Sequence, residues 1–534
     1  MSLAWRLLGC AVAIIWLHAL SVVPMLYDHG QWPDALRAVQ PDLLVLLLIA
    51  AIGGAVRRPK LASHLAAMLL LMGLVTRLTT VIVRINFQRD FELSDFLLFG
   101  GLYHALTNAA EAWQVWLGGA VTIVTVLLLQ WSTARAFRSA ATICQRQRPA
   151  AASMALLGIT ALLATTWAVA PSHPSMLLRL AKSVTSATQI WLNPQSVLAP
   201  IEQRIAVGSK RMAEVPSNLE LLNSADVHVL VLESYGRLMF RHPELHASIK
   251  TLFADLQQPL RAAGFQSRTS ACAPAIAGGL SGLAHAELLT GVVVPDERTR
   301  DMLLSSSLVT FPHRFLQAGY HTVEVQPAMP RAWPEGEAFY GIEESIWQQQ
   351  LAYRGSKFGF GRMPDQYSLH YLLDQVIRPA KQPVFSMFVG VSGHAPWSSV
   401  PPYVAHWPSH EQVYQQGPAN KYDIGYTNMQ RNPAALAAYG EAIRYTLRAA
   451  VDFTCQLRRP SLVIVLGDHQ PPIASSVQPA DRTHDVPVHV LSNQPELLAR
   501  LAAVGFVAGL HLPADVKAMP MADLAPKLLQ AFSK

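Results

Sequence analysis

The stretch 461–469, SLVIVLGDH, decides the fold of the second half of this chain. It joins a short apolar run, rich in valine and isoleucine, to a glycine, an aspartate and a histidine. Such a run is typical of a fully buried strand in a parallel sheet. Because open α/β sheets carry their chemistry at the carboxyl ends of parallel strands, we expect Asp468 and His469 to belong to a functional site.

Further apolar runs of the same character recur in this half of the chain, at 227–234, 321–327, 383–392 and 486–492. Stretches with helical spacing separate them. One of these, 432–457, opens with an asparagine cap and a proline at the first helical position. Alternating strands and helices predict a mostly parallel central sheet with helices on both faces. We therefore expect one α/β domain over residues 225–534.

The composition of the whole chain indicates a membrane protein. Of its 534 residues, 51% are hydrophobic and only 14% are charged, which is too apolar for an average soluble protein. The first third holds five candidate membrane spans, at 5–27, 40–56, 61–83, 114–132 and 151–171. We expect a transmembrane domain of about five helices over 1–171. A connector that can include an interfacial helix follows over 172–224.

Basic residues predict the orientation of these spans. Short loops rich in arginine and lysine stay in the cytoplasm. Such residues lie between the second and third spans and after the fourth: Arg57, Arg58, Lys60, Arg135, Arg138, Arg146 and Arg148. The N-terminus is therefore expected in the cytoplasm and the α/β domain outside. These residues account for most of the net charge of +7, and no basic run interleaved with aromatic residues argues for nucleic-acid binding.

Polar or ionisable residues follow three of the expected strands. Glu233 ends the first run, His394 follows the run 383–392, and Asp468 with His469 follows the run that opened this section. Taken singly, a glutamate at a strand end is more often a surface or capping residue, and a lone histidine is more often structural. Because parallel strands deliver their carboxyl ends to one edge, the three ends together predict a single crevice.

Two carboxylates and an imidazole suffice to bind Zn²⁺ or Mn²⁺ when a fourth position is open or taken by a reacting group. A hydroxyl bound to such a cation loses its proton more easily and becomes a nucleophile. The stretch 264–292 is the candidate source of this hydroxyl, because a strand-like segment is followed there by small residues and then by a helical run. A helix N-terminus would help to hold the attacked phosphate. For any one hydroxyl in it, a helix cap is the alternative.

Four segments now carry a resemblance: LVLESYGR (230–237), SRTSACAP (267–274), SGHAPW (392–397) and LGDHQPP (466–472). In this order, behind apolar spans, they resemble the lipoteichoic acid synthase group of the alkaline phosphatase superfamily, the sulfatase-like enzymes. Related membrane phosphoethanolamine transferases share the plan. The resemblance implies an alkaline phosphatase/sulfatase-like α/β fold. It also implies one divalent metal ion, zinc or manganese, with magnesium as an alternative.

The resemblance also implies roles for single residues. Glu233, Asp468 and His469 correspond to metal ligands, and Thr269 to the threonine that both binds the metal and attacks the phosphodiester. The residues expected to contact substrate are His394, His484, Trp333 and Arg331.

The chain departs from the family pattern near the expected nucleophile and in the expected pocket. The acidic residues that follow the synthase nucleophile are absent at 271–274, and a histidine and an aspartate are missing from 326–339. Cys272 begins a stretch similar to the one that sulfatases convert to formylglycine, but Ile276 stands where the arginine belongs. Cys272 and Ser270 are the less favoured alternative nucleophiles. Sequence spacing leaves open whether Cys272 and Cys455 form a disulfide.

By resemblance, the function is metal-dependent transfer of a phospho-alcohol headgroup, phosphoglycerol or phosphoethanolamine. The donor would be a membrane phospholipid, the acceptor an envelope glycan or lipid, and the intermediate a covalent threonine adduct. One alternative is a sulfatase or phosphodiesterase-type hydrolase with the same site, and another is a non-catalytic envelope binding protein. The expected location is the bacterial inner membrane, with several spans and a periplasmic or otherwise extracytoplasmic catalytic domain.

Overall fold

The computed structural model describes residues 41–87, 112–146 and 192–534, together with a few isolated residues before 192. Within the last range, Ser217 and the segments 361–362, 408–412, 416–420, 426–427 and 478–482 are not described. The chain divides into two compact units, the first within residues 1–196 and the second essentially Val197–Lys534. The first and fifth predicted spans lie almost entirely outside the described residues.

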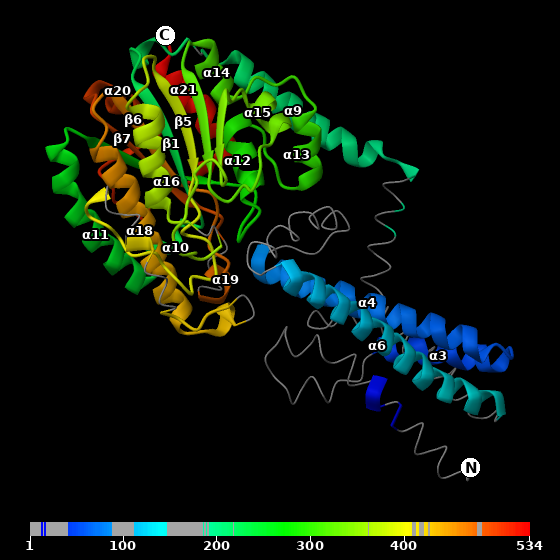
Figure 1. The fold of residues 1–534 in the computed structure, drawn as a ribbon. Coiled ribbons are helices and arrows are strands. Elements are labelled where there is room, and N and C mark those ends of the chain that lie inside the picture. Colours follow the sequence, from blue (N-terminus) through cyan, green and yellow to red (C-terminus); the bar gives the residue numbers. More distant parts are fainter. Residues whose placement is uncertain are drawn as a thin grey trace. The chain divides into compact units, whose positions relative to one another are not determined.

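Three apolar helices form the main described part of the first unit: α3 (Pro41–Ala55), α4 (Pro59–Phe87) and α6 (Ala112–Arg146) (Figure 1). Helices α3 and α4 pack closely at Gly53, where an added Cβ would lie 2.0 Å from the Cβ of Ala62. Two stretches, Pro59–Thr76 and Trp116–Ser139, are long and apolar enough to cross a membrane. They agree with the third and fourth predicted spans. The described residues do not confirm five.

Helix α6 extends further than the sequence predicted. Arg135 and Arg138 were expected in a loop after a span ending at residue 132, but both lie inside the helix, which ends at Arg146. This prediction was wrong because charge and helix content are independent: arginine is a good helix former, so a helix can continue past the end of its apolar stretch.

The second unit is built on one nine-stranded sheet with the order β4–β3–β5–β1–β6–β7–β2–β8, and β9 pairs with β2. Its strands are β1 (Asp226–Leu232), β2 (Gln266–Ala273), β3 (His321–Gln326), β4 (Glu344–Trp347), β5 (Val384–Val389), β6 (Ser461–Gly467), β7 (Val486–Ser492), β8 (Val507–Ala508) and β9 (Met519–Pro520). The five runs predicted as strands are confirmed.

The sheet is parallel in its centre and mixed overall. The neighbours β4, β3, β5, β1 and β6 all pair in parallel. Strand β7 runs antiparallel to β6, and β2 runs antiparallel to β7. The predicted run 486–492 is therefore a strand of the opposite direction. An apolar run carries no sign of its direction, which depends on the connection that precedes it.

Alternate residues of the central strands feed two cores, one on each face. Leu230 and Val463 join one apolar cluster, whereas Val229 and Ile464 join the other. All seven positions of β1 and of β6 are buried, which explains their continuous apolar runs. Each face of the sheet therefore carries its own apolar core.

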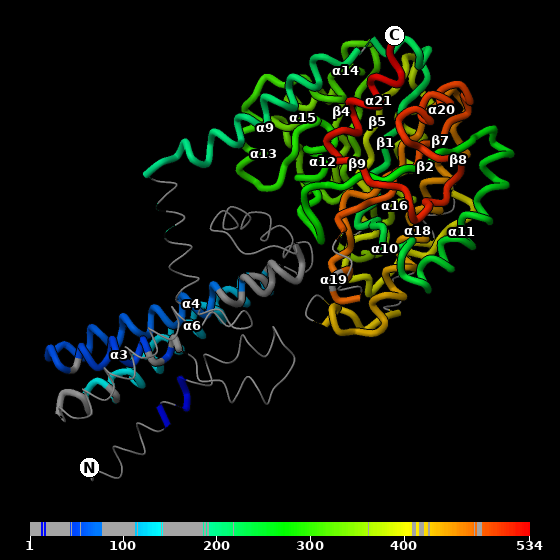
Figure 2. The backbone as a smooth tube through the Cα atoms, turned by 180° about the vertical axis from the view of Figure 1, so that it is seen from behind, coloured from blue at the N-terminus to red at the C-terminus, as the bar shows by residue number. Residues whose placement is uncertain are grey.

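Helices cover each of these cores, which confirms the prediction of helices on both faces of the sheet. The first lies under α11 (Pro243–Ala262), α16 (Asp365–Tyr371) and α18 (Ala434–Cys455) (Figure 1). The second lies under α12 (Ser281–Thr290), α14 (Phe311–Gln317), α20 (Pro495–Leu501) and α21 (Leu524–Phe532), seen from behind in Figure 2. Shorter or peripheral helices are α10 (Leu238–Arg241), α13 (Glu297–Leu304), α15 (Pro334–Tyr340) and α19 (Ala474–Val477).

One helix of the predicted connector, α9 (Gln195–Glu214), is described, and it packs on the α/β unit. Met212 is buried in the second core, and Arg211 pairs with Asp523 at 2.5 Å. Most of the stretch proposed as an interfacial helix lies before residue 192, outside the described residues.

The strand order places three carboxyl ends side by side. Strands β5, β1 and β6 are direct neighbours, and their registers align Val231 with Val389 and Leu232 with Gly467. The chain therefore leaves the sheet at Glu233, Gly390 and Asp468 along one edge, where the candidate site lies.

Candidate functional site

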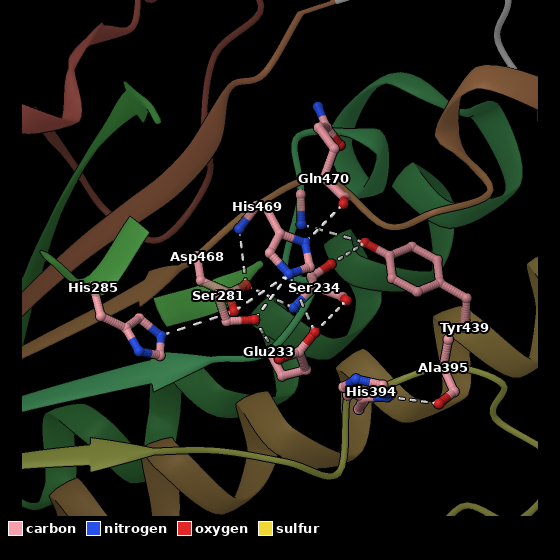
Figure 3. A network of polar contacts seen from close by, with 12 residues as sticks. Glu233, Ser234, Ser281, His285, His394, Ala395, Tyr439, Asp468, His469 and Gln470 are labelled. Atoms are coloured by element: carbon pink, nitrogen blue, oxygen red, sulfur yellow. Dashed lines mark hydrogen bonds and ion pairs between the residues drawn. The ribbon is translucent and has the colours of Figure 1, made fainter. Parts of the chain in front are cut away.

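Glu233, Asp468 and His469 meet at this edge of the sheet (Figure 3). Each offers one ligand atom, and the three atoms lie within 4.8 Å of one another. His469 Nε2 lies 3.4 Å from Glu233 Oε1 and 3.6 Å from Asp468 Oδ2. All three side chains are buried, with exposed fractions of 7%, 2% and 1%. The structure thus gathers the three residues that the sequence predicted as ligands.

Backbone contacts hold the two strand ends in this arrangement. Asp468 Oδ1 accepts hydrogen bonds from the backbone N–H groups of Ser234 and His469, both at 2.8 Å. Asp468 Oδ2 remains directed at the cluster. Ser234 has a positive φ of 60°, a left-handed conformation that turns the chain sharply after Glu233. The hydroxyl of Ser234 donates to Glu233 Oε1 at 2.8 Å.

Two glycines allow the strand ends to approach. A Cβ on Gly467 would lie 1.9 Å from the carbonyl oxygen of Tyr235, and a Cβ on Gly393 would lie 2.1 Å from that of Glu233. Any side chain at either position would push the strand ends apart. The glycines of the segments LGDH and SGH therefore have a steric reason.

The ring of His469 presents a lone pair to the cluster. Its Nδ1 lies 2.9 Å from the carbonyl oxygen of Gln470, which can only accept, so Nδ1 carries the proton. In the neutral ring Nε2 is then an acceptor that faces both carboxylates. This orientation by a backbone carbonyl is typical of metal-binding histidines.

Ser281 completes the cluster. Its Oγ lies 3.1 Å from Glu233 Oε2 and 3.1 Å from His469 Nε2. Ser281 is the first residue of α12, and Leu280 before it has a left-handed φ of 61°. The N–H of Gly278 donates to the carbonyl of Gln470 at 3.1 Å, which ties this turn to the Asp-His loop. A hydroxyl at the start of a helix therefore points at the centre that Glu233 and His469 face.

The structure contradicts the prediction that Thr269 binds the metal and acts as nucleophile. Thr269 lies inside β2, where its hydroxyl donates to the carbonyl of Gly509 at 2.6 Å and bonds His489 Nδ1 at 2.8 Å. Thr269 lies opposite His489 of β7, and His489 lies opposite Val465 of β6. Val465 is three residues before Asp468. Two strand spacings and three residues separate the Cα atoms of Thr269 and Asp468 by roughly 14 Å.

The alternative nucleophiles lie in the same strand. Cys272 is fully buried, and burial, Glu287 and Asp485 raise the pKa of its thiol well above the ordinary value. The hydroxyl of Ser270 donates to the carbonyl of Gly505 at 3.3 Å. Cys272 and Cys455 are both free thiols. One sequence signal pointed to Ser281: the stretch 264–292 was predicted as a strand followed by a helix, and Ser281 begins that helix.

Charge in the cluster is unevenly balanced. Burial opposes the ionisation of Glu233, but His394, His469 and the hydroxyls of Ser234 and Ser281 outweigh it and lower its pKa. Burial and the charge of Glu233 raise the pKa of Asp468. Burial lowers the pKa of His469, but Asp468 and Glu233 overcome it and raise that pKa. Two buried carboxylates beside one another favour a cation between them.

This donor set fits a divalent metal ion. Two carboxylate oxygens and an imidazole nitrogen are ligands that zinc and manganese accept, and the Ser281 hydroxyl stands where a fourth group would be. The prediction of a metal site at this edge therefore has the chemistry it needs, while the ligand roles stay a prediction.

His394 lies beside the cluster, as predicted (Figure 3). Its ring stacks on Phe360 with centroids 3.9 Å apart, and its Nδ1 donates to the carbonyl of Ala395 at 2.7 Å. Its effect on the pKa of Glu233 shows that it is close to that carboxylate.

Of the other predicted substrate contacts, His484 lies near the loop that leads to the cluster, whereas, among the described residues, Trp333 and Arg331 do not contact it. His484 lies just before β7, with Nδ1 at 3.3 Å from the carbonyl of Pro274 on the loop that leads to Ser281. Trp333 precedes α15 and its ring lies edge-on to that of Tyr340, 6.2 Å between centroids. Arg331 is exposed. No contact among the described residues joins Trp333 or Arg331 to the cluster.

Sequence reasoning missed His285 as well as Ser281. His285 lies one turn after Ser281 on α12, and its Nε2 is 3.9 Å from Asp468 Oδ2. Burial and His469 lower the pKa of this imidazole, and Asp468 opposes them. A groove of about 950 Å³ between α11 and α18 shares none of the cluster residues and is not part of the site.

Comparison with known proteins places part of the chain in a family. Residues 230–495 match the family model described as Sulfatase. No curated protein matches the sequence significantly.

Three of the similar solved structures are a synthase and two transferases. They are the lipoteichoic acid synthase LtaP from Listeria monocytogenes (16% identity, TM-score 0.36, 50% of this chain and 65% of that one), the phosphoglycerol transferase GacH from Streptococcus pyogenes (13%, 0.37, 63% and 92%) and the integral membrane lipooligosaccharide phosphoethanolamine transferase A from Neisseria meningitidis (12%, 0.46, 91% and 88%). The chain thus covers less than two thirds of the first. Because every TM-score is below 0.5, we base no conclusion on these similarities.

The predicted resemblance is confirmed at the level of the family by the matched segment, which contains Glu233, Ser281, Asp468 and His469. Residues 230–495 are a domain of the Sulfatase family.

Proposed function

We propose that this protein transfers a phospho-alcohol headgroup, phosphoglycerol or phosphoethanolamine, from a membrane phospholipid to a glycan or lipid acceptor of the cell envelope. The reaction depends on one divalent ion, zinc or manganese, held by Glu233, Asp468 and His469. Ser281 takes the role that the sequence suggested for Thr269.

One observation carries the proposal: the Oγ of Ser281 lies 3.1 Å from both Glu233 Oε2 and His469 Nε2. An ordinary helix cap would direct its hydroxyl to a backbone N–H of its own first turn. Ser281 instead points its hydroxyl at two groups that face a common centre. When bound, a divalent ion would lower the pKa of this hydroxyl and offset charge on the phosphoryl oxygens.

The chain's residues support a two-step transfer. Ser281 Oγ bonds to the phosphorus of the lipid headgroup while the bond to diacylglycerol breaks, and the hydroxyl proton of Ser281 ends on the released diacylglycerol. An acceptor hydroxyl then attacks the phosphoserine ester, and its proton returns to Ser281. The two displacements leave the serine unchanged and conserve the phosphodiester count.

Neighbouring groups would stabilise the charge that develops on phosphorus. Ser281 begins α12, where the positive end of the helix dipole favours an anionic phosphoryl group. His394 beside Glu233 is available for an equatorial oxygen. His484 approaches from the loop at Pro274. Fixed donors around a phosphoryl group are the main source of rate enhancement in this class of reaction.

A lipid donor agrees with the apolar first unit, which contains two helices able to cross a membrane by length and composition. We propose that the protein lies in the bacterial inner membrane with several spans, its N-terminus in the cytoplasm and residues 225–534 outside. The predicted division at residues 171 and 224 belongs to this proposal. A reporter fused after Lys534 that is active only in the periplasm tests this orientation.

The test of function is mass spectrometry of the full-length protein after incubation with vesicles of phosphatidylglycerol, phosphatidylethanolamine or phosphatidylcholine. Trypsin releases Thr269–Arg298 as one peptide that contains Thr269, Ser270 and Ser281. A headgroup adduct on this peptide identifies the donor, and fragment ions distinguish Ser281 from Thr269. An adduct on Thr269, or none with any lipid at saturating metal, would refute the proposal.

A hydrolase with the same site is the second candidate, favoured by the description of the matched family. It differs in the second step, where water replaces the acceptor hydroxyl. Release of free glycerol phosphate or phosphoethanolamine at the same rate with and without envelope extract would favour the hydrolase.

A further inference from the structure

His285 of α12 carries a buried ring nitrogen beside the cluster. Its Nε2 is buried and has no hydrogen-bond partner among the residues that the structure describes, although the whole side chain is 14% exposed. Asp468 Oδ2 lies 3.9 Å from this nitrogen, beyond hydrogen-bonding distance. Leaving a buried N–H unpaired is unfavourable, so such atoms call for a partner that arrives later.

The ring of His285 points toward the cluster that contains Ser281 (Figure 3). Residues four apart on a helix lie on one face, with Cβ atoms about 6 Å apart. Side chains on a helix also lean toward its N-terminus. His285 therefore leans from α12 toward Ser281, and Figure 3 shows its ring pointing toward the cluster.

His285 lies beside the ligand set. Among the described residues, the group of possible ligand atoms within 4.8 Å of one another contains Glu233, Asp468 and His469 but not His285. Its Nε2 is therefore offset from the centre that Ser281 Oγ faces. An oxygen bonded to the attacked phosphorus would occupy such an offset position.

We propose that His285 binds substrate directly, its Nε2–H donating a hydrogen bond to a non-bridging oxygen of the phosphoryl group at Ser281. The inference rests on the proposed function, because it requires a phosphoryl group at that serine. His285 is then a catalytic residue that stabilises the transferred group.

The test uses the full-length protein in detergent, loaded with Mn²⁺, and three variants. His285→Ala removes the donor, and His285→Gln places an amide N–H close to the position of Nε2. His246→Ala is the matched control, because His246 also lies on a helix and has a buried Nε2 without a partner among the described residues. Equilibrium dialysis measures binding of labelled inorganic phosphate, and elemental analysis measures bound manganese.

We expect His285→Ala to weaken phosphate binding roughly tenfold or more, and to lower kcat for bis(4-nitrophenyl) phosphate by roughly 10²-fold. His285→Gln should recover most of both losses. Manganese content should stay at the wild-type level in every variant, and His246→Ala should behave as wild type.

Three results would overturn the inference. If His285→Ala binds phosphate as tightly as wild type, His285 does not contact the phosphoryl group. Loss of manganese from His285→Gln as well as His285→Ala would make His285 a ligand of the ion. If manganese-loaded wild type binds no phosphate at all, the proposed function fails first and the inference fails with it.

Discussion

Replacing Thr269 by valine tests whether the hydroxyl that the family resemblance indicated has a role in turnover, or whether that role belongs to Ser281. Valine has nearly the same shape and suits a strand, so the change removes the hydroxyl and little else. We expect a less stable protein whose folded fraction is fully active.

The expected loss of stability follows from the contacts of this hydroxyl. Thr269 Oγ1 donates to Gly509 and accepts from His489 Nδ1, whose Nε2 in turn accepts from Tyr235 Oη at 2.8 Å. Burial lowers the pKa of His489 to about 3, so the ring stays neutral and can shift its proton to Nε2. The carbonyl of Gly509 then remains as the main unpaired group. We estimate a cost of about 1–3 kcal/mol, the price of one buried polar group without a partner.

The assay combines thermal unfolding of full-length protein, followed by tryptophan fluorescence, with turnover of bis(4-nitrophenyl) phosphate at saturating Mn²⁺. For Thr269→Val, a loss of about 1–3 kcal/mol lowers the melting temperature by several degrees. The matched variant Ser281→Ala should do the opposite, retaining stability and losing at least about 10³-fold in kcat. A Thr269→Val protein that is folded, binds manganese and is inactive would refute the assignment of Ser281.

The remaining predictions concern the metal, the strand ends and pH. Removing the divalent ion with EDTA should abolish turnover and lower the melting temperature, since a bound ion stabilises the folded state. Adding Mn²⁺ or Zn²⁺ back should restore both, and activity that survives metal-free dialysis would contradict the proposed metal site. Gly393→Ala should weaken manganese binding, measured by elemental analysis, because the added Cβ would lie 2.1 Å from the carbonyl oxygen of Glu233. The control Gly264→Ala should leave metal binding unchanged despite the positive φ at that position, because no atom lies within 4 Å of its added Cβ. Burial raises the pKa of Glu324 from 4.5 to about 7. The folded protein therefore holds this proton more tightly than the unfolded chain, and the stabilisation is lost as pH rises from about 4.5 through 7. Glu324→Gln should unfold at a higher temperature than wild type at pH 8 but not at pH 4.5, whereas an equal difference at both pH values would show that Glu324 does not titrate in this range.

The central strands and the cluster of two carboxylates and a histidine could be predicted from the sequence for one reason. Buried parallel strands need continuous apolar runs, and polar residues directly after those runs must lie at the sheet edge. Glu233, His394, Asp468 and His469 all follow neighbouring strands, so their meeting required no knowledge of loops. The glycines at 393 and 467 were visible in the motifs, but their purpose required the distances to opposing carbonyls.

The first unit was less predictable. Apolar composition indicates a membrane segment but does not tell where a helix ends, and α6 continues through Arg135 and Arg138. The direction of β7 was also hidden, because an antiparallel strand with both faces buried has the same apolar run as a parallel one.

By itself, the amino-acid sequence determined the α/β class, the five central apolar strands and the three residues of the proposed ligand set. Only the tertiary structure decided which hydroxyl joins them. Thr269 and Ser281 are twelve residues apart in one promising stretch, and the choice depends on where β2 ends and the loop 274–280 returns the chain to the sheet edge. A residue within a strand is fixed by its register, here opposite His489, whereas a residue after the strand can reach a centre formed by other strands. That position depends on packing across the whole sheet, which local sequence does not encode.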